Sequence, residues 1–354
     1  MRIEAIRQTL SATGARDCHI NRVLRAWTQA KPLTSGPRHQ PAEDFLPLAL
    51  RNALPGLDAE LAGLVRLRSE HAGEDGSRLL VELADGQLVE SVLLPRNGLC
   101  ISTQVGCAVG CTFCMTGRDG LLRQVDSGEM VAQVVLARRQ RVVSRVVFMG
   151  MGEPSHNIDN VLEAIDTLGT YGGIGHKNLV FSTVGDYRVF DRLPQERVRP
   201  ALAISLHSTS AERRAELLPR AAAIPPEKLV ELAESYARTT GNPIQYQWTL
   251  IEGVNDSQQE MDGIVRLLAG KYALMNLIPY NVTAALDYRR PSTASITALA
   301  QYLHSRGIRT TVRNSAGQDV DGGCGQLRAR NLERPVRRHP IKPARATMDD
   351  GSAH

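Results

Sequence analysis

The sequence predicts an α/β protein whose main part is a partial (βα)6 barrel, open on one side. Two observations support this prediction. From about residue 100, apolar or β-branched runs alternate with helix-like stretches, a pattern typical of a parallel sheet. Six such units follow one another, fewer than the eight of a closed barrel. In such folds the chemistry lies on loops that follow the carboxyl ends of the strands.

The predicted barrel occupies residues 100–330. Its six expected strands are Ile101–Val105, Val142–Met149, Asn178–Thr183, Ala201–Leu206, Ile244–Ile251 and Ala273–Ile278. Helix-like stretches lie between them, for example Ser127–Arg139, Asn157–Leu168 and Asp256–Leu268. A last strand, Arg309–Arg313, precedes a glycine-rich loop that contains Cys324, and this loop is counted with the barrel.

Two smaller regions precede the barrel. Residues 1–57 are expected to be helical, because apolar residues recur at helical spacing from Ile3 to Leu10 and from Ile20 to Trp27. A third short helix is expected from Ala42 to Leu54, and Cys18 is expected to be a buried structural thiol. Residues 58–99 form a small antiparallel β unit, since Asp85-Gly86 joins two apolar runs in the manner of a β hairpin.

Composition narrows the protein class. No run of about 18 apolar residues occurs, and the N-terminus lacks an apolar signal core, so we expect a cytoplasmic protein without membrane contact. Six cysteines in a reducing compartment favour metal or redox chemistry over a disulfide framework.

Positive charge is concentrated near the C-terminus. The net charge of the chain is +5, and Arg328–Arg345 holds seven Lys or Arg against one acid, which leaves the rest of the chain nearly neutral. Residues 331–354 are therefore expected to be a basic, disordered tail. Two roles stay open for it: contact with nucleic-acid phosphates, or a solvated tail that keeps the protein soluble.

The most specific motif is a group of three thiols, Cys107, Cys111 and Cys114, at the spacing C-x-x-x-C-x-x-C. A closed structural zinc site needs four ligands, and no fourth Cys or His follows at zinc-finger distance. Three thiolates suit a [4Fe–4S] cube that keeps one iron open to a small molecule. The spacing resembles the signature of radical S-adenosylmethionine (SAM) enzymes, with a zinc knuckle or a group of buried thiols as the alternative.

Polar residues follow several predicted strands. The loop Met149–Pro154 contains Gly152, which lets the backbone approach a ligand, and Glu153, which can accept hydrogen bonds from an ammonium group. Other strand-end candidates are Ser182, Ser205, Leu206, His207 and Asn281. Strand capping or a buried core histidine is the alternative interpretation. Cys100 and Cys324, far apart in sequence, are either a thiol–disulfide pair or two unrelated thiols.

With these motifs assembled, the chain resembles the RlmN/Cfr family of radical SAM RNA methyltransferases from about Val89 to Leu327. The motifs that carry the resemblance are Val89-Glu90-Ser91-Val92, Cys100–Cys107, Met149–Pro154, Ala203–His207, Asn276–Pro279 and Cys324–Leu327. It implies a radical-SAM barrel with a [4Fe–4S] cluster on Cys107, Cys111 and Cys114. Gly152, Glu153, Ser182, Ser205, Leu206, His207 and Asn281 match SAM-binding positions. RNA binding is a candidate role for residues 1–57.

The resemblance also implies a reaction that uses two SAM molecules per turnover. Cys324 matches the cysteine that takes a methyl group from the first SAM. A 5′-deoxyadenosyl radical from the second SAM then removes a hydrogen from that S-methyl group, and the carbon adds to adenine. Glu90 matches the proton acceptor. Cys100 matches the thiol that resolves the covalent adduct as a disulfide, after which an external reductant is needed.

The implied substrate is RNA, with carbon 2 of an adenine in 23S rRNA as the expected target and tRNA as a further possibility. The implied partners are that RNA and an electron donor such as flavodoxin, and the chain is expected to act as a monomer. Alternatives are a carbon-8 methyltransferase of the Cfr type, a non-methylating iron–sulfur RNA-binding relative, and a radical SAM enzyme for a small molecule or protein.

Overall fold

The computed structural model describes residues 1–36, 40–74, 76–283, 286–313 and 327–328. Cys324 and the predicted tail, residues 331–354, lie outside the described residues. Within the described residues no helix has the length and apolar composition needed to cross a lipid bilayer.

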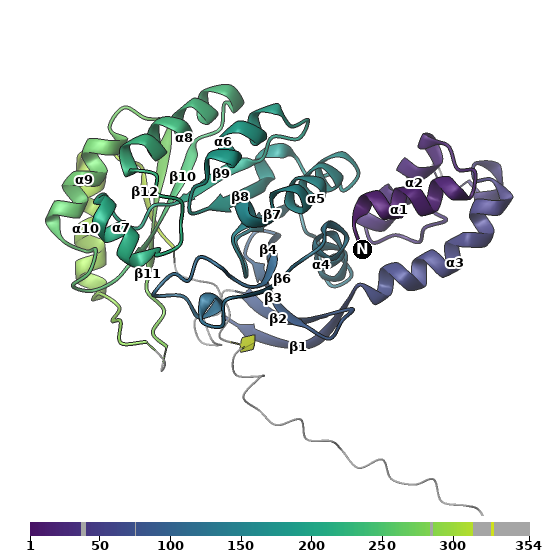
Figure 1. The fold of residues 1–354 in the computed structure, drawn as a ribbon, viewed down its shortest axis with the longest axis horizontal. Coiled ribbons are helices and arrows are strands. Elements are labelled where there is room, and N and C mark those ends of the chain that lie inside the picture. The colour runs from purple at the N-terminus through teal and green to yellow at the C-terminus, as the bar shows by residue number, and fades with distance from the viewer. Residues whose placement is uncertain (37–39, 75, 284–285, 314–326, 329–354) are drawn as a thin grey trace, which may run out of the picture.

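One ten-stranded sheet organises the described part of the molecule (Figure 1). Its strands are β1 (Val65–Gly73), β2 (Gly76–Leu83), β3 (Leu88–Leu94), β4 (Gly98–Ile101), β7 (Arg145–Phe148), β8 (Leu179–Thr183), β9 (Ala201–Ser205), β10 (Ile244–Leu250), β11 (Ala273–Pro279) and β12 (Thr310–Val312). They lie side by side in chain order. Neighbours from β4 to β12 are parallel, which confirms the predicted parallel α/β fold.

The predicted hairpin is not a separate sheet. β1, β2 and β3 pair antiparallel with one another, and β3 pairs antiparallel with β4, so the β unit extends the barrel sheet at one edge. This continuity places the end of β3 directly beside the first barrel strand, with Val92 opposite Cys100.

The first predicted strand, Ile101–Val105, is divided in the structure. β4 ends at Ile101, and β5 (Gln104–Gly106) pairs antiparallel with β6 (Leu121–Gln124) in a second, two-stranded sheet. The break lies at Ser102, whose backbone N–H donates to Gln133 Oε1 at 3.0 Å and whose hydroxyl donates to the Glu90 carbonyl at 2.5 Å. At Ser102, hydrogen bonds to and from side chains replace the backbone hydrogen bonds between strands, and the chain leaves the main sheet.

Helices cover the outer face of the barrel sheet (Figure 1). They are α4 (Ser127–Arg138), α5 (Ile158–Thr170), α6 (Tyr187–Arg192), α7 (Ala211–Leu217), α8 (Pro226–Thr240), α9 (Gln258–Leu268) and α10 (Thr293–Ser305). Alternate strand residues such as Val146 and Phe148 are fully buried in the main core beneath these helices. Their neighbours Arg145 and Val147 line a cavity instead, because side chains alternate between the two faces of a strand.

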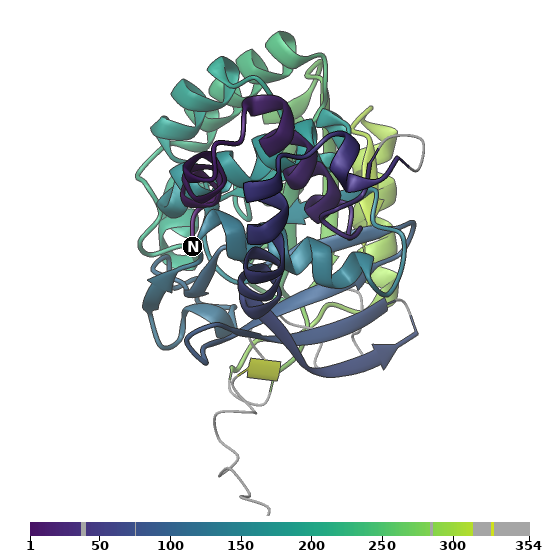
Figure 2. The ribbon, with the colours of Figure 1, turned by 90° about the vertical axis from the view of Figure 1, so that its right-hand side faces the viewer.

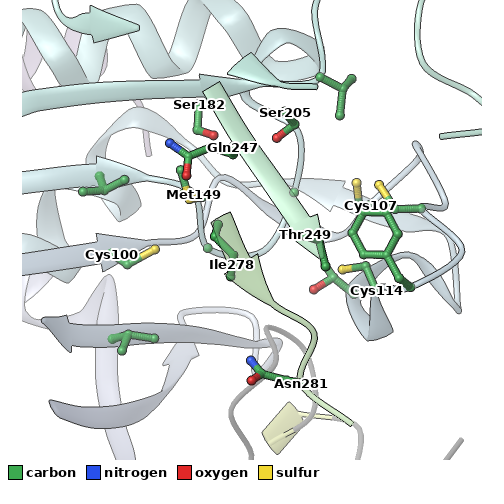
Figure 3. A pocket seen from close by; sticks show the side chains of 18 of the residues that line it. Cys100, Cys107, Cys114, Met149, Ser182, Ser205, Gln247, Thr249, Ile278 and Asn281 are labelled. Atoms are coloured by element: carbon green, nitrogen blue, oxygen red, sulfur yellow. The ribbon is translucent and has the colours of Figure 1, made fainter. Parts of the chain in front are cut away.

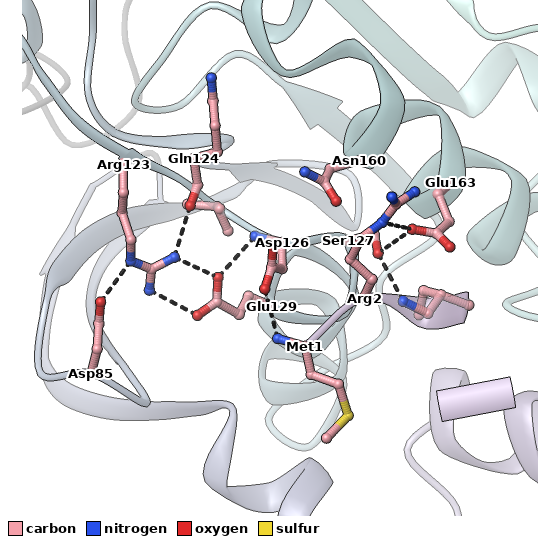
Figure 4. A network of polar contacts seen from close by, with 12 residues as sticks. Met1, Arg2, Asp85, Arg123, Gln124, Asp126, Ser127, Glu129, Asn160 and Glu163 are labelled. Atoms are coloured by element: carbon pink, nitrogen blue, oxygen red, sulfur yellow. Dashed lines mark hydrogen bonds and ion pairs between the residues drawn. The ribbon is translucent and has the colours of Figure 1, made fainter. Parts of the chain in front are cut away.

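The N-terminal region forms α1 (Ile3–Ala12), α2 (Asp17–Thr28) and α3 (Leu48–Gly63). α1 and α2 pack against α4 and α5, and α3 leads into β1 (Figures 1 and 2). Contacts with Ser127 and Glu163 hold it there (Figure 4). The Ser127 hydroxyl accepts from the Ile3 N–H at 2.9 Å, and Arg2 pairs with Glu163 at 3.1 Å. The first residues of the chain are thus attached to the barrel's own helices.

Two details of this region differ from the expectation. The helix expected from Ala42 to Leu54 is instead α3, which begins at Leu48 and continues to Gly63 with Pro55 inside it, because Leu54, Leu57 and Leu61 keep one face buried. The prediction that Cys18 is buried was wrong: the thiol is exposed. Cys18 lies in the first turn of α2, whereas the buried face of that helix begins at Ile20.

Candidate active site at the mouth of the barrel

A cavity of about 340 Å³ occupies the inner face of the barrel. Two of the three motif thiols, Cys107 and Cys114, lie at one end of it, and Cys100 lies toward the other end (Figure 3). Cys111 also lines the cavity. The fold therefore brings the three-cysteine loop and Cys100 to a single space, although Cys100 belongs to a strand and the loop follows β5.

The three-cysteine loop is fixed by backbone contacts from other parts of the barrel. The Cys107 N–H donates to the Gly120 carbonyl at 2.9 Å, and the Thr112 N–H donates to the Leu217 carbonyl at 3.0 Å. Gly106 enters the loop with a φ of +79°, and a side chain there would lie 2.0 Å from the Gly120 carbonyl oxygen. Glycine is therefore required for the turn that presents Cys107.

The three thiols offer the soft donor atoms that an iron–sulfur cluster takes. Burial raises the pKa of Cys107 to about 12, with smaller contributions from Glu153 and Cys114, and burial also raises the pKa of Cys111. Bare thiols here stay protonated, so a metal or cluster would have to displace the protons on binding. Among the described residues no three potential ligands converge tightly enough for one metal ion. Cysteines of a four-iron cube bind different irons, so they stand farther apart.

The glycine-rich loop after β7 presents Glu153 to the same cavity. Its carboxylate accepts from the Ser155 N–H at 3.0 Å and from the Val184 N–H at 2.9 Å. Gly152 has a φ of +104°, and a Cβ would lie 2.6 Å from the Gln104 side chain. Backbone donors therefore orient a carboxylate that is 4% exposed, and its remaining lone pairs are available to a cationic ligand group.

His207 links the strand ends to the cysteine loop. Its ring packs edge-on against Phe113, with the ring centroids 5.0 Å apart. Nδ1 accepts a hydrogen bond from the Thr249 N–H at 2.9 Å, so the proton of the neutral ring lies on Nε2. Burial, with a smaller contribution from Arg214, lowers the pKa of His207 to about 3. The ring is therefore a neutral donor at physiological pH.

We predict a pH effect from His207. Its pKa in the folded protein, about 3, is below the ordinary value of about 6.5, so acid favours the unfolded chain. The stabilisation is complete above pH 6.5 and is lost progressively toward pH 3. Between pH 7.5 and 5 the cluster-free protein should lose about 2 kcal/mol through this residue. His207→Asn, which tolerates the local φ of +60°, should show a correspondingly smaller loss in urea unfolding. Equal losses in both proteins would contradict this.

The other predicted strand-end residues divide into two groups. Ser182, Ser205 and Asn281 line the cavity, so the structure brings them together with Glu153 and the cysteine loop (Figure 3). The Leu206 side chain instead belongs to the main core and is fully buried. A ligand in the cavity therefore has no access to that side chain.

Arg214, which sequence reasoning missed, lies behind the cysteine loop. Its guanidinium is 4% exposed and donates to the carbonyl oxygens of Val184 and Ser205. Burial lowers the pKa of Arg214 to about 10, and the neighbouring Cys111 and Glu153 oppose that change. Arg214 thus places a positive charge near the thiols and the carboxylate. Its position on a short helix after β9 gave no periodic signal.

Glu90 lies beside the cavity in a buried ion pair. One carboxylate oxygen accepts from Arg78 at 3.0 Å, and the other accepts from the backbone N–H of Arg328 at 2.9 Å. Both side chains of the pair are almost fully buried, at 2% and 1% exposure. Arg78 lines the cavity. Glu90 therefore contacts the chain four residues after Cys324, which itself lies outside the described residues.

This ion pair gives a prediction about stability that is separate from any catalytic role. Glu90→Gln removes the negative charge beside a buried guanidinium, and we expect a loss of about 3–5 kcal/mol of unfolding free energy. The double variant Arg78→Met/Glu90→Met should recover much of that loss, because it removes both charges together. Denaturant unfolding at neutral pH measures the unfolding free energy of the single and the double variant. A loss below about 1 kcal/mol for Glu90→Gln would show that the pair contributes little.

The inner face of β10 supplies further polar groups that sequence reasoning missed. Gln245, Gln247 and Thr249 all line the cavity. Their signal was present in the sequence, because polar residues alternate with Ile244, Tyr246, Trp248 and Leu250 along the strand. Such alternation identifies one polar face. In an open barrel that polar face points inward.

Comparisons with known proteins agree with this geometry. Residues 101–267 match the family model described as "Radical SAM superfamily". A "Probable RNA methyltransferase" of Dechloromonas aromatica is 80% identical over 94% of this chain and 94% of its own length. One from Azoarcus sp. is 69% identical over 98% and 99% of the two chains. A crystal structure titled as a radical SAM methyltransferase from Sphaerobacter thermophilus is 33% identical, with a TM-score of 0.78, covering 92% of this chain and 97% of that one.

Proposed function

We propose, from the premise that this chain belongs to the radical SAM RNA methyltransferases, that it methylates carbon 2 of an adenine in RNA. Carbon 2 is taken from the family resemblance, and the observation that supports the thioether route most is the single cavity shared by the three-cysteine loop and Cys100. An enzyme that only cleaves SAM has no use for a separate thiol in that cavity. A methyl transfer that passes through a covalent thioether requires one.

The residues at the cavity mouth would hold the cofactors. Cys107, Cys111 and Cys114 would bind a [4Fe–4S] cluster, and Glu153 would accept from the amino group of SAM. His207 offers an Nε2–H donor, and Ser182, Ser205 and Asn281 offer further polar contacts. When bound, the cluster supplies one electron to SAM and takes one back, so that a ring carbon without nucleophilic character can be alkylated.

The chain's own groups carry the methyl group. Cys324 takes an intact methyl from one SAM as a nucleophile and releases S-adenosylhomocysteine. One hydrogen atom of that methyl group would leave with the adenosyl fragment of the second SAM, and the carbon would then bridge the Cys324 sulfur and the adenine ring. Glu90 accepts the ring proton. The Cys100 thiolate then attacks the Cys324 sulfur, the carbon–sulfur bond breaks, and the carbon gains a proton to complete the methyl group. An external two-electron reductant restores both thiols from the disulfide.

The partners follow from the same proposal. The substrate is an RNA, and 23S rRNA is favoured over tRNA. An electron donor such as flavodoxin supplies the reducing electrons. We place the reaction in the cytoplasm. We assign it to a monomer, because the cysteine loop, Cys100 and Glu153 of one chain line a single cavity. The basic residues 331–354 would add phosphate contacts.

Anaerobic incubation with total bacterial RNA, methyl-labelled SAM and a reductant tests the proposal. Mass spectrometry of the digested nucleosides should find label in 2-methyladenosine, and fractionation of the RNA should place it in 23S rRNA. Cys114→Ala protein is the matched control and should give none. Label at carbon 8, at a nitrogen or at a ribose oxygen would overturn the assignment of carbon 2, and label in tRNA alone would overturn the rRNA target.

A further inference from the structure

Gln247 presents an unsatisfied acceptor to the interior of the barrel. The residue lies on β10, is 2% exposed and lines the cavity. Its Oε1 atom is buried and has no hydrogen-bond partner within the described part of the chain. Its amide lies between Ser182 and Met149 (Figure 3). A buried amide oxygen left unpaired is unfavourable, so such an atom indicates a ligand that donates to it.

The orientation of the amide is set by its own strand. Nε2 donates to the carbonyl oxygen of Gln245 at 3.4 Å, a long contact that nevertheless directs Oε1 the other way. The group offered to the cavity is therefore an acceptor. The complementary group on the ligand is an N–H or O–H donor.

Gln247 lies on the inner face of the sheet, paired with Ser205 at the end of β9. β10 continues for three residues beyond it to Leu250. In Figure 3 it lies toward Cys100, and the cluster thiols Cys107 and Cys114 lie at the opposite end. Gln247 and the thiol proposed to resolve the RNA adduct line the same cavity. The apolar side chains of Val147, Met149, Val180 and Ile278 line the same cavity and suit a flat aromatic ring.

Two arginines make this cavity cationic. Arg145, at the start of β7, and Arg313, after β12, both line it. The Arg145 Nε atom is buried without a partner among the described residues. Burial, followed by the nearby charge of Arg145, lowers the pKa of Arg313. Like charges gathered in one part of the cavity favour a ligand that carries an anionic group there.

We propose that Gln247 binds the adenine base that enters the barrel, with Oε1 accepting from the exocyclic amine and Arg145 and Arg313 facing a phosphate of the same nucleotide strand. Glutamine is a common partner of adenine because its amide matches the donor and acceptor atoms at the amine edge of the base. That this base is the methylation target in RNA rests on the proposed function. The amine is present whichever ring carbon is methylated, so Gln247 selects adenine without selecting the carbon.

Nucleotide binding tests this without methylation. Cluster-reconstituted protein, saturated with SAM and without reductant, is titrated with adenosine 5′-monophosphate and with purine riboside 5′-monophosphate, which lacks the amine. Equilibrium dialysis should show about tenfold or greater preference for the adenine nucleotide. Gln247→Ala should reduce that preference to near one. Gln247→Glu keeps an acceptor and should retain it, and Gln245→Ala, on the same face of β10, is the matched control that should also retain it.

An arginine variant and the affinity of the protein for SAM provide the remaining tests. Arg145→Met should weaken both nucleotides by the same factor and leave the preference unchanged. No preference for the adenine nucleotide in the parent protein would overturn the inference. So would a Gln247→Ala protein that keeps the preference and loses affinity for SAM, since Gln247 would then serve the adenine of SAM. A preserved preference for adenine without RNA methylation would reject the proposed function alone.

Discussion

Cys114→Ala protein should contain almost no iron and should methylate no RNA. Anaerobically reconstituted parent protein is expected to be brown, with about four irons and matching sulfide per chain, as a [4Fe–4S] cluster requires. Removing one of three thiol ligands leaves two, which cannot hold the cube with an open iron. Activity should fall to background, because no other described group supplies one-electron chemistry.

Cys18→Ala is the matched control for this loss. It removes one thiol from the same chain, but that thiol is exposed on α2, apart from the cavity. Iron content and activity should equal those of the parent. Iron and sulfide assays with the visible spectrum measure both variants. Stoichiometric zinc without sulfide in the parent, or full iron in Cys114→Ala, would contradict the cluster assignment.

Cys100→Ala and Cys324→Ala should both lose product formation but stop at different steps. Cys324→Ala has no acceptor for the first methyl, so it should form neither product nor adduct. Cys100→Ala should still receive the methyl on Cys324 and attack RNA, and then stall. The stalled species is a covalent protein–RNA complex, which survives denaturants. A denaturing gel with ribonuclease treatment detects it as a band that shifts on digestion.

The position of Cys100 makes this difference specific. The thiol is 7% exposed, lines the cavity and lies on β4 beside Val147. The double variant Cys100→Ala/Cys324→Ala should form no complex. A complex that persists in the double variant, or its absence from Cys100→Ala after incubation with SAM and RNA, would show that these thiols have other roles.

The sequence predicted the barrel well because the alternation of strands and helices is a local pattern. The residues at which individual helices and strands begin and end were harder to predict. The third helix was expected to end at Leu54, but tertiary packing of Leu57 and Leu61 carries α3 on to Gly63. The division between β4 and β5 depends on contacts from Gln133, a residue distant in sequence. Neither effect is visible in a local window of residues.

The site shows the same limit. The three-cysteine loop and Glu153 were recognisable because their spacing is short. Gln247 was visible only as one polar residue in an alternating strand, and its unpaired oxygen depends on the whole barrel. Arg145 and Arg313 come from strands far apart in sequence, and only the curvature of the sheet brings them to one cavity. The exposure of Cys18 depends on which face of α2 packs against the rest of the protein.

The isotopic composition of the transferred methyl group tests the central claim most directly. The enzyme is expressed in unlabelled medium. It is then given RNA, a reductant and SAM that carries a trideuterated methyl group, and is allowed many turnovers. Transfer through a Cys324 thioether removes one deuterium before the carbon joins adenine, so the methyladenosine should contain two deuterium atoms. Direct transfer by a single displacement keeps all three. Product with two deuteriums on a ring carbon is the predicted result, and product with three would contradict the account.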